Sequence, residues 1–142
     1  MTFSPSMTFI NLPVKDLEKS MNFFKQIGFS FNPQFTDENA ASMVINDNTF
    51  SMLLTEAHFQ NFTDKEIVNA TKQTECLVSF AVESREQVDA IIKKAIDAGG
   101  SYASEHVIMA ICIRSVSRIL MGIFGKYSTW INQGMHNSNK RE

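Results

Sequence analysis

Hydrophobic and polar residues first fall into a regular pattern at residues 8–14, which have the sequence TFINLPV. Ile10, Leu12 and Val14 occupy every second position, the spacing of a β-strand with one face against a core. Pro13 has no backbone N–H to donate, so we expect this strand at the edge of its sheet or ending near this residue.

The spacing becomes helical in the next segment, LEKSMNFFKQI at residues 17–27. Its apolar side chains recur every three to four residues, at Leu17, Met21, Phe24 and Ile27. Asp16 predicts the start of the helix as an N-cap, and Gly28 predicts its end as a C-cap. Further strands are predicted over residues 29–35, 41–46 and 49–57, with the NDN of 46–48 as a hairpin turn.

The same order of elements then starts again. CLVSFAV at 76–82 predicts a strand, and REQVDAIIKKAIDA at 85–98 predicts a helix that ends before two glycines. Ser84 and Gln87 have the spacing of a capping box. The repeat indicates an α+β fold of paired βαβββ modules. No hairpin signal follows Val107, so we expect the second module to be incomplete.

Charge separates the end of the chain from the rest. Residues 1–106 carry 8 Lys and Arg against 14 Asp and Glu, whereas residues 107–142 carry 5 basic residues and a single acid. We therefore expect a domain over 1–106, with modules at about 7–60 and 74–106, followed by an aberrant tail over 107–142.

Composition excludes several classes of protein. A net charge of −2 and the lack of a basic stripe in the first hundred residues argue against nucleic-acid binding. The two cysteines, Cys76 and Cys112, have neither metal nor redox spacing. The chain opens with no secretory signal, and its apolar runs are too short to span a bilayer. We expect a cytoplasmic protein without nucleic-acid or membrane partners.

The stretch NLPVKDLEKSMNFFKQIGF resembles the opening of the glyoxalase/bleomycin resistance protein/extradiol dioxygenase (vicinal oxygen chelate) superfamily. That family has the pattern L-x-V-x-D-L-x-x-S, then a pair of aromatic residues, then G-F. The matching residues here are Leu12, Val14, Asp16, Leu17, Ser20, Phe23, Phe24, Gly28 and Phe29. The resemblance covers about residues 7–106, and it implies two curled sheets that pair around a small-molecule cup, the glyoxalase/bleomycin-resistance fold.

Enzymes of this family hold a divalent metal in the cup on four His, Glu or Gln side chains. By resemblance, the first ligand position is Phe9, the second is Leu53 and the third is Leu77. None of these side chains carries an imidazole, carboxylate or thiolate donor. The sequence therefore predicts no metal and no other cofactor.

The family's fourth ligand lies in a late motif, F-x-x-P-D-G-H-x-W-E-V, which the chain lacks. A shifted codon frame across ILMGIFGKY, residues 119–127, accommodates PDGHFWEV in order. For example, the last base of the Met121 codon and the first two of the Gly122 codon must encode Gly. We interpret the tail as frameshifted. The alternative is a genuine amphipathic or membrane-surface helix.

The cup lining is predicted from strand alternation. If Ile10, Leu12 and Val14 pack under the helices, the opposite face carries the ligand-binding residues. This assignment gives Phe9, Asn11, Ser51, Leu53, Thr55, Leu77 and Ser79. Such a lining suits a mostly apolar small molecule. No catalytic residue is assigned, because His58 and Glu56 are expected to be solvated surface residues.

Three functions remain open at this point. The first is a metal-free protein of the superfamily that binds a small apolar molecule, as a homodimer when the second module is intact. The second is a lactoylglutathione-lyase-like or dioxygenase-like enzyme that has relocated its ligands. The third is an inactive frameshifted product.

The frameshift makes a prediction about the gene. A single-base change near codon 107 is expected to restore the closing motif, because the loss of Asp and the reversal of charge begin near that point. Sequencing the locus measures this directly. A gene in which no such change recovers the motif would contradict the interpretation.

Overall fold

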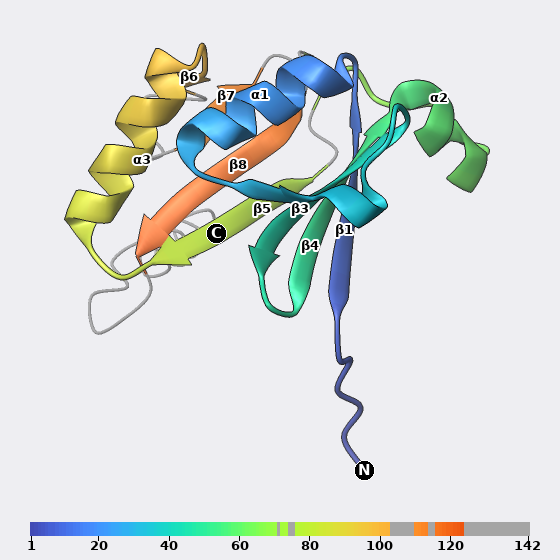
Figure 1. Ribbon diagram of the computed structural model, residues 1–142, viewed down its shortest axis with the longest axis horizontal. Helices are drawn as coiled ribbons and strands as arrows, with labels where there is room; N and C mark the ends of the chain where they lie inside the picture. The colour runs from blue at the N-terminus through green and yellow to red at the C-terminus, as the bar shows by residue number, and fades with distance from the viewer. Residues whose placement is uncertain (71, 74–75, 103–109, 114–115, 124–142) are drawn as a thin grey trace, which may run out of the picture.

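The protein is described by a computed structural model over residues 1–70, 72–73, 76–102, 110–113 and 116–123 (Figure 1). The side chains of residues 77, 79, 81 and 85, and of residues from 101 onward, lie outside this description.

The first module forms a four-stranded sheet. In chain order it contains β1 (Thr8–Val14), α1 (Leu17–Ile27), β2 (Ser30–Asn32), β3 (Ala40–Asn46) and β4 (Thr49–Thr55). The strands lie side by side in the order β1-β4-β3-β2, with β1 parallel to β4 and the other pairs antiparallel. β1 is therefore an edge strand, as Pro13 predicted.

Local chemistry explains where the elements of this module begin and end. The Asp16 side chain accepts a hydrogen bond from the backbone N–H of Lys19 at 3.0 Å, which caps α1. Gly28 ends the helix at a φ of 120°, a conformation that residues with a side chain rarely adopt. β2 is shorter than predicted, because Pro33 begins a 3₁₀ helix, η1 (Pro33–Phe35), instead of continuing the strand.

The second module repeats this topology. It contains β5 (Leu77–Val82), α3 (Arg85–Asp97), β6 (Ser101–Tyr102), β7 (Ala110–Ile113) and β8 (Val116–Ile123), arranged in the order β5-β8-β7-β6. Half of the predicted capping box is present: Ser84 Oγ accepts from the N–H of Gln87 at 3.2 Å. The Gln87 side chain also reaches back, but its Oε1 accepts at 2.9 Å from the N–H of Glu83, the residue before the N-cap. The paired βαβββ fold is confirmed.

One part of the fold prediction is wrong. The second module was expected to lack its closing strands, yet β7 and β8 lie within the tail and complete a four-stranded sheet. β8 runs parallel to β5, as β4 does to β1. Backbone pairing can recruit any extended segment of suitable length, so the missing family motif does not prevent it. The rest of the tail, residues 107–109, 114–115 and 124–142, lies outside the described residues.

A connection between Thr55 and Leu77 joins the modules. It begins with α2 (Glu56–Phe59) and a 3₁₀ helix, η2 (Gln60–Phe62), immediately after β4. Across the described part of the chain, the helices are all too short or too polar to cross a membrane.

The two modules share one hydrophobic core. Leu12, Val14 and Phe24 from the first module belong to the same buried cluster as Val88 and Ile92 of α3. The helices α1 and α3 contact each other, and β1 contacts β8 (Figure 1). The modules therefore meet on their helix sides.

Aromatic rings continue this core from one module to the other. The Phe24 and Phe29 ring centroids are 5.9 Å apart, and the Phe29 and Phe80 centroids are 5.7 Å apart. Ring pairs at these distances contribute about 0.5–1.5 kcal/mol each beyond the area they bury. The chain of rings therefore fixes how the second sheet sits against the first.

Deleting residues 108–142 is expected to destabilise the protein, because β5 would lose its parallel partner β8 and the second sheet would expose an edge. A loss of about 2 kcal/mol would lower the melting temperature by roughly 5–10 °C in a chain of this size. Differential scanning calorimetry measures the change. A matched deletion of residues 124–142 alone retains both strands and should have the smaller effect. An unchanged transition in the longer deletion would instead indicate that the tail is inert.

Candidate functional site

The first sheet has two chemically different faces. Ile10, Leu12 and Val14 lie on the face covered by α1, and Leu12 and Val14 are fully buried there. The intervening residues of β1 lie on the opposite face, which we call the cup face. By the strand register, the cup face also carries the side chains of neighbouring strands that pair with these residues of β1. These residues are Phe9, Asn11, Ser42, Val44, Phe50 and Met52.

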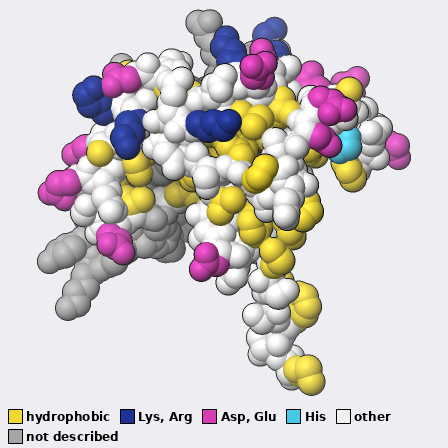
Figure 2. Space-filling model, in the orientation of Figure 1, with side chains coloured by type: hydrophobic (Ala, Val, Ile, Leu, Met, Phe, Trp, Pro, Cys, Tyr) yellow, Lys and Arg dark blue, Asp and Glu magenta, His cyan; other side chains and the backbone are white. Residues whose placement is uncertain are grey.

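An aromatic pair marks the open end of the cup face. The rings of Phe9 and Phe50 are stacked, with centroids 5.5 Å apart and an interplanar angle of 20°. Phe9 is 53% exposed, which is unusual for a ring that already has an aromatic partner. Figure 2 shows hydrophobic side chains gathered over the first sheet and continuing along the N-terminal segment. An apolar ligand or a partner surface could therefore stack on this pair.

The other end of the cup face is closed. Leu54 is only 4% exposed and Pro13 is buried, and neither belongs to the core cluster under α1. Both lie at the end of the sheet where α2 contacts β1 and β4. The cup face is thus a half-closed apolar surface that carries the exposed Asn11 and the buried Ser42.

The structure places Phe9 and Asn11 on the face that strand alternation predicted. The prediction for β4 is wrong: Ser51, Leu53 and Thr55 pair with Ile10, Leu12 and Val14 and share their face. Leu53 is 0% exposed within the core. Alternation within one strand does not determine how the neighbouring strand is aligned with it. The prediction assumed an alignment shifted by one residue from the observed one, and such a shift moves every side chain of a strand to the other face. Phe50 and Met52 take the positions on the cup face instead.

Leu77 and Ser79, the predicted residues of the second module, lie on β5 beside Arg118 and Leu120 of β8. Their side chains lie outside the described residues. The alternate residues of the strand, Val78, Phe80 and Val82, are half-buried, and Phe80 and Val82 pack against the shared core.

The positions that would hold a metal by family resemblance do not fit one. Phe9 is stacked on Phe50. Leu53 lies in the core on the helix side of the sheet, so it does not occupy a position in the cup. Leu77 offers no donor atom of any kind. Among the described residues, no three His, Cys, Asp or Glu side chains come close enough to share an ion.

Two titratable residues near the sheet, Asp37 and His58, make local contacts. Backbone N–H groups of Asn39 and Ala40 donate to the Asp37 carboxylate at 2.8 and 3.0 Å, and these bonds lower the pKa of Asp37. They order the turn that leads into β3. The His58 ring lies edge-on to Phe62 with centroids 5.5 Å apart, and it is partly buried, where a solvated loop side chain was expected.

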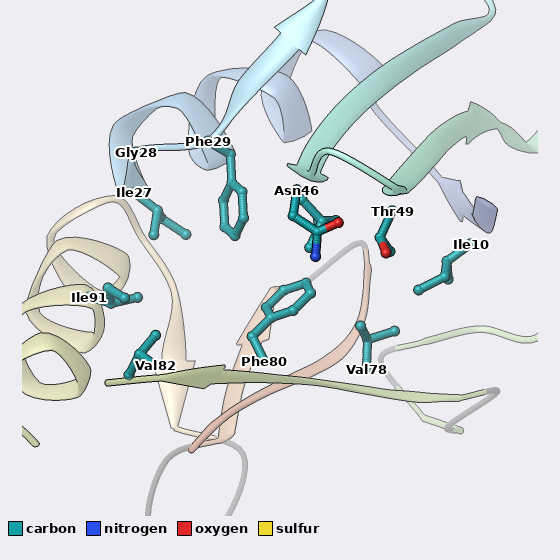
Figure 3. Close-up of a pocket in the computed structure, with 11 residues that line it drawn as sticks. Ile10, Ile27, Gly28, Phe29, Asn46, Thr49, Val78, Phe80, Val82 and Ile91 are labelled. Carbon is teal, nitrogen blue, oxygen red and sulfur yellow. The ribbon is translucent and has the colours of Figure 1, made fainter. Parts of the chain in front are cut away.

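A cavity of about 660 Å³ lies between the two modules on the helix side of the first sheet (Figure 3). We call it the intermodule pocket. From the first module it is lined by Ile10, Ile27, Gly28, Phe29 and Ile45, with Asn46 and Thr49. The second module contributes Val78, Phe80, Val82 and Ile91. The sequence marked these residues only as apolar, because a space between modules depends on how they pack.

Comparison with known proteins supports the resemblance. The family described as bleomycin resistance protein-like N-terminal matches residues 6–46. A hypothetical protein, SA1046 from S. aureus, has 29% sequence identity over 84% of this chain and 95% of its own, with a TM-score of 0.63. No curated protein matches the chain.

Two further solved structures share the fold. A glyoxalase/bleomycin resistance protein/dioxygenase family enzyme from Burkholderia phytofirmans PsJN has 14% identity over 82% of this chain and 97% of its own, with a TM-score of 0.62. A glyoxalase-related enzyme from Fulvimarina pelagi has 14% identity over 83% and 88%, with a TM-score of 0.63.

Replacing Ser51 with Ala tests which face this residue occupies. Ser51 is 1% exposed and its Oγ has no hydrogen-bond partner among the described residues. Removing an unsatisfied buried hydroxyl should leave the free energy of unfolding unchanged or raise it by roughly 1 kcal/mol. Urea denaturation measures this value.

Thr36→Val is the matched control, because the Thr36 hydroxyl donates to the Asn32 carbonyl at 2.7 Å and accepts from the Ser42 N–H at 3.2 Å. Loss of the hydroxyl and its two hydrogen bonds should lower the free energy of unfolding by about 1–2 kcal/mol. A destabilising Ser51→Ala substitution of the same size would contradict the placement of Ser51.

Proposed function

Because the chain belongs to the glyoxalase/bleomycin resistance/dioxygenase superfamily, we propose that it binds a small, largely apolar molecule on the cup face without a metal ion. The exposed, stacked pair of Phe9 and Phe50 is the observation that carries this proposal. A flat apolar ligand would extend the stack and cover ring surface that otherwise faces water.

The shape and polarity of the cup face support binding of such a molecule. Its closed end, at Leu54 and Pro13, would exclude water from one side of the ligand. The exposed Asn11 supplies a hydrogen-bonding group that would orient it. The side chains of the cup face carry no charge, so the surface is poorly suited to stabilising the charged transition states of lyase or dioxygenase chemistry.

The proposed active form is a homodimer. The modules of one chain meet on their helix sides, so the second sheet does not cover the cup face of the first. A second copy of the chain could place its own second module over Phe9 and Phe50 and complete the cup. Isologous pairing of this kind is the commonest way in which soluble proteins assemble.

Phe9→Ala and Phe50→Ala are expected to weaken binding of a neutral fluorescent probe, N-phenyl-1-naphthylamine, to the full-length chain. Loss of one stacking partner is worth roughly 1 kcal/mol, or about five-fold in Kd. Fluorescence titration measures the affinity, and light scattering on the same samples reports the oligomeric state. Because Phe9 is largely exposed, its replacement should leave the melting temperature nearly unchanged.

Phe62→Ala is the control, since Phe62 is 72% exposed and lies outside the cup face. Equal affinity in wild type and Phe9→Ala would argue against binding at this face. A stoichiometric, tightly bound divalent metal in the purified protein would overturn the metal-free part of the proposal and favour an enzyme with relocated ligands.

A further inference from the structure

The intermodule pocket lies on the opposite side of the first sheet from the cup face. Ile10 and Thr49 line it, and both occupy the helix-side register of their strands, whereas Phe9 and Phe50 occupy the other. We propose that this pocket is a second small-molecule site, which takes an uncharged, mostly hydrocarbon ligand with one acceptor oxygen.

The size and composition of the pocket support this inference. Its volume of about 660 Å³ falls within the range of roughly 300–1,000 Å³ that is usual for small-molecule sites. The walls are mainly aliphatic and aromatic side chains from both modules, and no lining residue within the described part of the chain is ionisable. Charged ligands would lose their hydration there without gaining a partner, so an uncharged ligand is favoured.

The aromatic contact between the modules sets the shape of the pocket. Figure 3 shows Phe29 and Phe80 extending toward each other from opposite walls, with ring centroids 5.7 Å apart and tilted by 50°. Ile91 and Val82 lie on one side of this pair, and Ile10 and Val78 lie on the other. A planar ligand could insert along the ring faces, and the rings would hold the walls apart when it leaves.

The described polar side chains that line the pocket come from one turn of the first sheet. Asn46 and Thr49 flank the turn between β3 and β4. The Asn46 Oδ1 accepts a hydrogen bond from the backbone N–H of Asn48 at 3.0 Å, which fixes the orientation of the amide. Figure 3 shows its nitrogen pointing toward Phe80. The NH₂ group therefore presents a donor to the apolar space, which is why the ligand should carry an acceptor oxygen.

Two probes that differ by one carbonyl group test the site on the full-length chain. We expect 2-acetylnaphthalene to bind more tightly than naphthalene, and we expect Asn46→Ala to remove most of that difference while leaving naphthalene binding unchanged. Val78→Phe, which fills the pocket, should weaken both probes at least ten-fold. Phe62→Ala, which lies outside both the pocket lining and the cup face, is the control and should change neither affinity.

The outcomes separate this inference from the proposed function. Binding that is lost in Phe9→Ala but retained in Val78→Phe would place the probes on the cup face and overturn the intermodule site alone. If neither set of substitutions matters, both sites fail. If Val78→Phe shows no cooperative thermal transition, Ile91→Phe is used in its place, because it fills the same pocket from α3. Loss of binding in Ile91→Phe supports the proposal, and full binding overturns it.

Discussion

The packing of the two modules against each other through Phe24, Phe29 and Phe80 is the constraint on which the rest of the structure depends. A four-stranded sheet with one helix has more apolar surface than that helix can cover, so each module needs a second layer. The ring contacts and the shared cluster of α1 and α3 supply it. Because the helix sides are used for this internal packing, the cup face of the first sheet is left for other molecules.

That arrangement produces two surfaces with similar chemistry in different places. The cup face carries an exposed ring pair, and the intermodule pocket carries a ring pair between two walls. Within the described part of the chain, neither surface brings together three His, Cys, Asp or Glu side chains that could share a metal ion. Binding at either place would rest on exclusion of water and on shape, with one or two amide or hydroxyl groups to orient the ligand.

Local features of the fold were predictable from the chain, whereas relations between strands were not. The caps at Asp16 and Ser84 and the helix end at Gly28 follow from side-chain chemistry within a few residues. The face occupied by Leu53 depends instead on how β4 is aligned with β1, and this alignment cannot be read from the sequence of β4. Likewise, the pairing of β8 with β5 needs only an extended backbone, so the unusual composition of the tail concealed it.

The sequence by itself therefore determined the element types and the repeat, because both are properties of residues that are neighbours in the chain. Only the tertiary structure decided which side chains share a face, that the modules meet on their helix sides, and that a cavity remains between them. These are consequences of register and of packing between Phe29 and Phe80, two residues far apart in the chain whose contact exists only when both modules have folded.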